Sequence, residues 1–330
     1  TRFSLVGLSQ LAKRALSKLG LEGDQLDQVH DVLLYAELRG RSQGLQKIIE
    51  RTVTPSPEAG TIAIVRAEGA TMRIDGAQNP GMVVSTYASD QAVALARNHG
   101  VGLAGTFNTS SSTGAIGFYA ERIAGEGMIG LVMAGSPKVM AMAGGIDPVF
   151  GTNPIAIAVP TPGKPVALDM ATAATAWFDL ITASRRGESI AKGLAFDCDG
   201  EPTSDPDAAM AGALTAFGGH KGAGLALMIE MLTGPLTGAG VVGDEDATSN
   251  RGMAIIAIKP SALVEQAEFD DAVDRMCARI RSGRSRQGSD GILLPGDSSR
   301  ARFERCLETG KIDVETAVLD GVRAIVESAG

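Results

Sequence analysis

The chain has 330 residues, of which 44% are hydrophobic, 21% charged and only 4% aromatic. A chain of this length and composition is globular rather than disordered and can bury two large hydrophobic cores. Its net charge of -8 disfavours binding to nucleic acid, and the absence of any apolar run of about 18 residues or more disfavours a membrane span.

The first 40 residues predict two amphipathic helices. Apolar residues recur with helical spacing from Leu8 to Leu19, and Gly20 ends the first helix. Asp24 can cap a second helix, which we expect to end near Gly40. The loop that follows therefore begins just beyond the C-terminus of a helix.

Short strands and helices alternate through the rest of the chain. The apolar runs of strand length are residues 61–65, 101–107, 128–134, 155–159, 166–170 and 253–258. The helix candidates are residues 89–98, 115–123, 177–184, 222–232, 264–280 and 314–326. This alternation predicts an α/β protein.

The cysteines favour a reducing environment. Cys198, Cys277 and Cys306 are widely spaced, and none belongs to a CxxC pair. This pattern favours free thiols over a disulfide framework or a zinc site. Residues 1–5 also lack the core of a signal peptide. We therefore expect a cytoplasmic protein without a metal.

The glycine motifs of the common nucleotide-binding folds are absent. No GxGxxG follows a strand and opens a helix, and no GxxxxGK[ST] loop occurs. The densest glycine cluster, residues 218–224, has a different spacing and opens a long apolar helix. A dinucleotide would therefore need another architecture.

Eight short motifs follow one another along almost the whole chain. They are LRG at 38–40 with Ser42 and Gly44, DG at 75–76, TGAIG at 113–117, GTNP at 151–154, LDMAT at 168–172, DG and PTSDP within 199–206, GGHKG at 218–222 and LPG at 294–296. In these motifs and their order the chain resembles the malate/L-lactate dehydrogenase family, from about Leu5 to about Val318.

The resemblance implies a fold, a reaction and an assembly. Members of this family reduce 2-oxo or 2-imino acids with a nicotinamide. The implied subunit has a non-Rossmann NAD(P)-binding mixed-sheet domain, a helical segment built from both termini, and a second copy in a homodimer. We expect residues 1–60 to form the N-terminal helical segment and substrate loop, and residues 61–260 the central NAD(P)-binding and catalytic domain. Residues 261–330 would form a C-terminal helical segment packed on the first.

Two motifs supply the expected cofactor contacts. His220, Lys221 and Gly222 open an apolar helix, whose free N–H groups and adjacent cation suit a phosphate-bearing ligand. Thr152 and Asn153 lie in a turn before a strand and, by the resemblance, contact the cofactor too. Without the resemblance, a structural histidine and an ordinary turn would explain these residues.

NADPH is the expected cofactor, with NADH as the alternative. Arg185, Arg300 and Arg302 are basic residues that can meet a 2′-phosphate. The competing interpretation is that these arginines are solvated surface residues.

The substrate loop carries cations that suit a small anionic substrate. By the resemblance, Lys47 occupies the position of an arginine that grips the substrate carboxylate, and Arg39 adds to the same cationic patch. Lysine keeps the charge but loses the bidentate fork. Ser112, Thr113 and Met142 are expected to line the substrate pocket. Relatives often carry a histidine at the position of Ser112, and Pro-Trp at the pair that begins with Met142.

The expected acid/base residue is replaced in this chain. Where family members read Ser-His-Gly, the sequence reads Ser42-Gln43-Gly44, and an amide cannot release a proton. Asp169 follows an apolar strand and, by the resemblance, matches the partner of the missing histidine. Local sequence also allows Asp169 to be the N-cap of the next helix. We expect Ser42, Gln43 and Asp169 to be the catalytic residues.

The missing histidine favours imine reduction over ketone reduction. A ketone becomes an alkoxide unless a proton arrives with the hydride, and such a donor contributes about 10²–10⁴-fold. A protonated imine already carries its proton. We therefore expect reduction of Δ1-pyrroline-2-carboxylate or Δ1-piperideine-2-carboxylate to L-proline or L-pipecolate. The alternatives are a 2-oxo or 2-hydroxy acid dehydrogenase of the malate, lactate or ureidoglycolate type, and a nicotinamide-binding protein that has lost catalysis.

Overall fold

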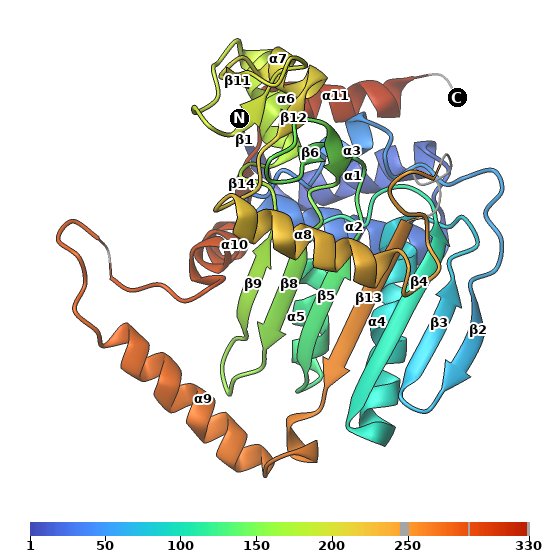
Figure 1. Cartoon of the computed structure of the whole chain (residues 1–330), viewed down its shortest axis with the longest axis vertical. Helices are drawn as coiled ribbons and strands as arrows, with labels where there is room; N and C mark the ends of the chain where they lie inside the picture. The colour runs from blue at the N-terminus through green and yellow to red at the C-terminus, as the bar shows by residue number, and fades with distance from the viewer. Residues whose placement is uncertain (245–250, 290, 329–330) are drawn as a thin grey trace.

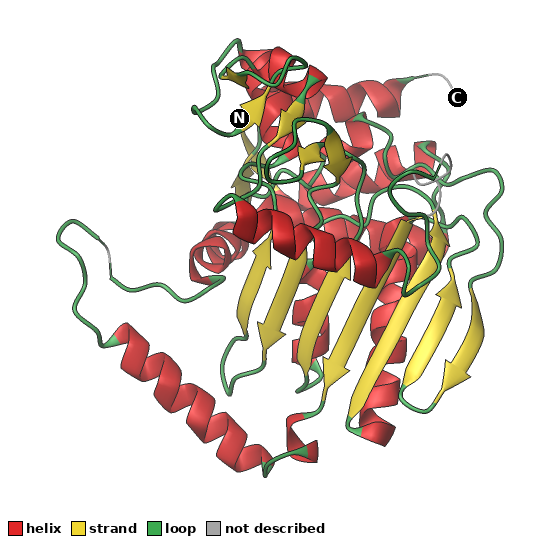
Figure 2. Ribbon diagram, in the orientation of Figure 1, coloured by secondary structure: helices red, strands yellow, loops and turns green. Residues whose placement is uncertain are grey.

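The computed structural model describes residues 1–244, 251–289 and 291–328. Within these residues the strands form a seven-stranded sheet, a five-stranded sheet and a two-stranded pair, surrounded by helices (Figure 1, Figure 2). The predicted α/β class is confirmed.

The main sheet is mixed, as predicted. In spatial order its strands are β2 (Ala63–Glu68), β3 (Thr71–Asp75), β4 (Val101–Thr109), β13 (Arg251–Ile258), β5 (Ile129–Ala134), β8 (Ile155–Val159) and β9 (Val166–Met170). β3 and β4 are parallel, and the other neighbours in this sheet are antiparallel. The C-terminal ends of β4, β5 and β9 therefore meet the N-terminal ends of β8 and β13 at one edge of the sheet.

Helices cover both faces of the main sheet. α4 (Gly81–His99) and α5 (Gly117–Gly125) pack on one face, and α8 (His220–Thr233) crosses the other (Figure 1). Small residues in the strands allow this close packing. A Cβ atom on Gly102 of β4 would lie 2.1 Å from the carbonyl oxygen of Ala92 in α4, so only glycine fits there.

The two ends of the described chain pack together. The elements are β1 (Arg2–Ser4), α1 (Leu5–Lys18), α2 (Gly23–Leu38), α3 (Gln46–Ile49), α10 (Asp297–Thr309), β14 (Lys311–Asp313) and α11 (Thr316–Glu327). β1 pairs antiparallel with β14, and α11 packs against α1 and α3. A Cβ atom on Gly321 of α11 would lie 2.8 Å from the side chain of Ile49 in α3. A helical segment built from both termini is therefore confirmed.

A smaller unit lies beyond the strand ends of the main sheet (Figure 2). It consists of β11 (Pro202–Thr203), β10 (Ala195–Phe196), β12 (Ala213–Leu214), β6 (Met140–Ala141) and β7 (Pro148–Phe150), with α6 (Trp177–Arg186) and α7 (Pro206–Ala211). Its core includes Met140, Phe150 and Leu180. The sequence pattern did not predict this sheet.

One helix extends away from the rest of the chain. α9 (Gln266–Arg281) follows a short 3-10 turn (Pro260–Ala262) and buries only Val273 and Cys277 (Figure 1). Within the predicted C-terminal segment, α11 packs on the N-terminal helices, whereas α9 projects outward. The three-segment division stays a prediction. No helix in the described ranges has the length and hydropathy needed to cross a membrane.

Candidate active site

A cavity of about 570 Å³ lies at the edge of the main sheet where the strand ends meet. Its walls come mainly from the loop 41–52, the turn 111–116 after β4, residues 134–137 after β5, residues 169–171 at the end of β9 and residues 176–178 at the start of α6. A volume of this size suits a small ligand or part of a larger one.

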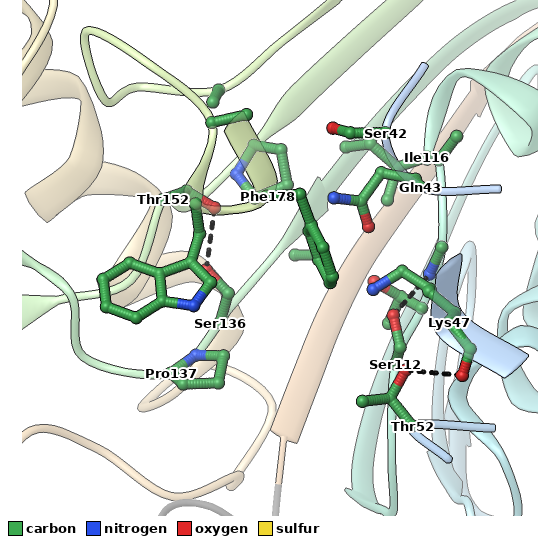
Figure 3. A pocket seen from close by; sticks show the side chains of 18 of the residues that line it. Ser42, Gln43, Lys47, Thr52, Ser112, Ile116, Ser136, Pro137, Thr152 and Phe178 are labelled. Carbon is green, nitrogen blue, oxygen red and sulfur yellow. Dashed lines mark hydrogen bonds between the residues drawn. The ribbon is translucent and has the colours of Figure 1, made fainter. Parts of the chain in front are cut away.

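Seven predicted site residues line this cavity. They are Ser42, Gln43, Lys47, Ser112, Thr113, Thr152 and Asp169. Gln43 and Lys47 lie on one wall and Ser136 and Thr152 on the opposite wall, with Phe178 between them (Figure 3). Four of the eight motifs that carry the family resemblance therefore contribute to one space.

The loop that carries Gln43 and Lys47 is held in place by the buried carboxyl group of Glu37. The backbone N–H of Leu45 donates a hydrogen bond to Glu37 Oε2 at 2.9 Å. A Cβ atom on Gly44 would lie 2.2 Å from the same oxygen, so the glycine of the motif permits this contact. Burial raises the pKa of Glu37, and the Leu45 N–H opposes that shift.

Lys47 is a buried cation on the cavity wall. Its side chain belongs to α3 and is 4% exposed. Its Nζ lies 4.5 Å from the centre of the Phe178 ring, and it forms no ion pair with any described residue. Burial lowers the pKa of Lys47 to about 7, Glu50 opposes this shift, and the charge of Arg251 adds to it.

Asp169 faces the same cavity from the end of β9. Burial raises the pKa of this carboxyl, whereas the charge of Arg41 and the backbone N–H of Gly117 lower it. A Cβ atom on Gly117 would lie 2.8 Å from Asp169 Oδ2. The alternative that Asp169 caps the next helix is wrong, because α6 begins only at Trp177 with Ala176 as its N-cap.

Thr152 and Asn153 take different positions although they are neighbours. Thr152 faces the cavity, and its hydroxyl lies 3.3 Å from that of Ser136. Asn153 is fully buried with a φ of 26°, and its Nδ2 donates to Glu230 Oε2 at 2.7 Å. Its side chain therefore ties the turn to α8 and does not reach the cavity. Its predicted role at the cofactor stays a prediction.

The GGHKG motif lies outside the cavity lining. His220 and Lys221 are exposed at the start of α8. Gly222 is buried, and a Cβ atom there would lie 2.3 Å from the carbonyl oxygen of Phe217. The glycine serves close packing, and the predicted contacts of His220 and Lys221 with the cofactor stay predictions.

Two predicted substrate residues do not line the cavity. The Arg39 side chain is directed to α5, where its Nη2 lies 2.7 Å from Glu121 and its guanidinium stacks 3.8 Å from the centre of the Tyr35 ring. Met142 is 37% exposed after β6. Arg39 therefore stabilises the helical segment instead of joining the cationic patch.

The three arginines predicted to contact a 2′-phosphate are not brought together. Arg185 is half-exposed, 3.9 Å from Glu50 on the cavity wall. Arg300 donates to the carbonyl oxygen of Pro165 at 2.5 Å, and Arg302 to that of Asp313 at 3.5 Å. Of the three, Arg185 is the one with a carboxylate neighbour that lines the cavity.

Arg251 and Phe178 are among the cavity residues that sequence reasoning missed. Arg251 begins the central strand β13, and its Nε is buried without a hydrogen-bond partner among the described residues. Burial lowers the pKa of Arg251. The sequence did offer one signal for Arg251: it is a charged residue at the start of a buried apolar strand. A buried charge at such a position is costly unless a ligand pairs with it.

Comparison with known proteins agrees with this fold. Residues 3–323 match the family model described as malate/L-lactate dehydrogenase, and the chain belongs to this family. It is an NAD(P)-dependent oxidoreductase.

Two relatives and one solved structure give the range of similarity. The chain is 35% identical to the L-sulfolactate dehydrogenase of Methanothermobacter thermautotrophicus over 328 residues, which cover 96% of this chain and 94% of that one. It is 44% identical to the Δ1-pyrroline-2-carboxylate reductase 1 of Burkholderia ambifaria over 220 residues, 64% of this chain and 62% of the relative. A dehydrogenase structure from Sinorhizobium meliloti superposes with a TM-score of 0.90 at 31% identity, covering 99% and 98% of the two chains.

Proposed function

We propose that the protein reduces a small cyclic 2-imino acid with NAD(P)H, converting Δ1-pyrroline-2-carboxylate or Δ1-piperideine-2-carboxylate to L-proline or L-pipecolate. The observation that carries this proposal is Gln43 on the cavity wall, where the family's acid/base histidine is expected. Its amide can hold a ring nitrogen by a hydrogen bond but cannot protonate an alkoxide. An imine nitrogen is basic enough to be protonated before the hydride arrives.

The shape and charge of the cavity support this substrate class. Ile116 and Phe178 offer apolar surface for the methylene groups of a five- or six-membered ring. Arg251 offers a guanidinium for the carboxylate, and Asp169 can balance the positive charge of a protonated imine. The similarity to a Δ1-pyrroline-2-carboxylate reductase points the same way and would connect the protein to proline metabolism.

A second candidate is a 2-oxo or 2-hydroxy acid dehydrogenase. Arg41, Lys47, Arg51 and Arg251 all line the cavity, and four basic side chains suit a substrate with two acid groups. The similarity to an L-sulfolactate dehydrogenase covers 96% of the chain and supports the same class.

Initial rates on the two substrate classes separate these candidates. We expect kcat/KM for Δ1-pyrroline-2-carboxylate or Δ1-piperideine-2-carboxylate to exceed that for oxaloacetate, pyruvate and sulfopyruvate by at least about tenfold, since only the imines can be protonated ahead of hydride transfer. Higher kcat/KM with an oxo acid would overturn the imine proposal. Tight nicotinamide binding without turnover on either class would favour a protein that has lost catalysis.

The residues present fit the nicotinamide end of the cofactor, which supplies the hydride when bound. The hydroxyls of Ser136 and Thr152 are suited to its carboxamide, and Trp177 lines the same cavity. We propose that the pyrophosphate and adenosine extend outward toward His220 and Lys221 at the start of α8. The preference for NADPH over NADH rests on Arg185, and the same assays run with each cofactor measure it.

We further propose that the protein is a homodimer. The outer face of α8 and the turn after it expose Met228, Met231 and Leu236, and α9 projects from the subunit with few contacts to its own chain. An apolar helix face and an extended arm suit a second copy of the chain. Sedimentation equilibrium at micromolar concentration is expected to give the dimer mass, and a monomer would contradict this proposal.

A further inference from the structure

Lys47 is held where it can reach a ligand, and it has no carboxylate partner among the described residues. Glu37 fixes the loop before α3, and Gly321 of α11 lies behind Ile49 of the same short helix. The Lys47 side chain enters the 570 Å³ cavity beside Phe178, on the same wall as Gln43 (Figure 3). A buried ammonium without an ion pair is costly, so this position indicates a function beyond packing.

Burial and the charged groups around Lys47 set its pKa close to neutral pH. Glu50 comes from the end of its own helix and Arg251 from β13, while Arg41, Arg51 and Asp169 line the same cavity from the substrate loop and β9. Arg185 of α6 lies 3.9 Å from Glu50, and its positive charge offsets part of the effect of Glu50 on the pKa of Lys47. Burial and Arg251 bring the pKa of Lys47 to about 7, where a group can both hold and release a proton.

We propose that the Lys47 ammonium donates the proton to the imine nitrogen of the substrate, in place of the histidine that the loop lacks. This role rests on the proposed function. The N–H bond of Lys47 breaks as an N–H bond forms on the imine, which leaves a neutral amine on Lys47 and a cation on the substrate. A bound nicotinamide would supply the hydride for the C2 carbon, which would give the secondary amine and NAD(P)⁺. Solvent returns the proton to Lys47.

The other polar groups of the substrate wall are poorer donors. Neither the Gln43 amide nor the Ser112 hydroxyl, which accepts from the N–H of Gly114 at 3.1 Å, releases a proton at accessible pH. Arg251 stays protonated, so it suits the carboxylate. This arrangement separates the two tasks: Arg251 binds the acid group and Lys47 supplies the proton.

Lys47→Arg is the decisive variant, because it restores the residue that binds carboxylate in the family. As proton donor, Lys47 cannot be replaced by arginine, which does not deprotonate in proteins. We expect kcat to fall by about 10²-fold or more with KM changed only a few-fold, and the loss of rate above pH 7 that Lys47 causes in the wild type to be absent from the variant. As a carboxylate anchor, Lys47 would be replaced well, and near-normal kcat in Lys47→Arg overturns the proposal.

Two further variants serve as a comparison and as a test of rescue. Arg251→Met is the matched comparison, and we expect it to raise KM far more than it lowers kcat. Adding Gln43→His to Lys47→Arg should recover at least about tenfold in kcat, because a histidine on the same wall can deliver the proton. Cofactor binding by each variant, measured by nicotinamide fluorescence, verifies that the protein has folded.

A measurement without substrate keeps this inference separate from the proposed function. Cyanate carbamylates only neutral amines, so the pH dependence of Lys47 labelling, read by peptide mass spectrometry, reports its ionisation directly. We expect half-maximal labelling near pH 7, and a midpoint near the usual lysine value of 10.5 overturns the proposal. If the wild type reduces only oxo acids, the imine proposal fails. The labelling still decides whether the pKa of Lys47 lies near 7.

Discussion

Lys47→Met is expected to raise the free energy of unfolding at neutral pH by several kcal/mol. The folded protein holds this lysine at a pKa of about 7, against 10.5 in the unfolded chain. At about 1.4 kcal/mol for each pKa unit, burying the charged form costs up to roughly 5 kcal/mol, which methionine of similar length avoids. Chemical denaturation of the two proteins measures the difference.

The pH dependence of this stabilisation has a definite sign. Between pH 7 and 10.5 the unfolded wild type binds more protons at Lys47 than the folded wild type does, so its stability rises with pH. The advantage of Lys47→Met is therefore largest below about pH 7 and disappears as the pH approaches 10.5. Lys192→Met, at an exposed position, serves as the control and should show little difference. A constant advantage at every pH would contradict this account.

Asp169→Asn is expected to lower kcat by about 10²- to 10³-fold. The carboxylate faces the cavity, and loss of an electrostatic partner for the developing charge costs roughly 3–4 kcal/mol in the transition state. Stability should change little, because asparagine keeps an oxygen that can accept from the Gly117 N–H. Steady-state kinetics and thermal unfolding measure the two effects.

Asp179→Asn is the matched control for this variant. Asp179 is exposed in the first turn of α6, close in sequence to the cavity wall but not part of it. Its replacement should leave turnover within a few-fold of the wild type. Near-normal turnover of Asp169→Asn as well would show that its carboxyl only supports the N-terminus of α5.

Long, strongly patterned elements were predictable from the sequence. The strands at 155–159 and 166–170 match β8 and β9 residue for residue, and α8 extends the predicted helix by a few residues. The five-stranded sheet was missed because its strands have two or three residues, too few to show an alternating pattern. α10 was missed because it is strongly polar and buries only Cys306.

The candidate site was predictable only where a motif carries it. Gln43, Lys47 and Asp169 were found through the family resemblance, and they do share a cavity. Arg251 has no local pattern, and its position depends on how β13 pairs between β4 and β5. Arg39 was misplaced because a cation near a motif does not reveal that Glu121, more than eighty residues away, pairs with it.

The packing of α11 behind α3 has a consequence for the order of folding during synthesis. The substrate loop leaves the ribosome early, yet the helix that supports it and the strand that pairs with β1 are made some 260 residues later. Until then the wall that carries Lys47 lacks its backing, and nascent chains cannot hold a complete cavity. Activity should therefore appear only after α11 has been synthesised and has packed behind α3.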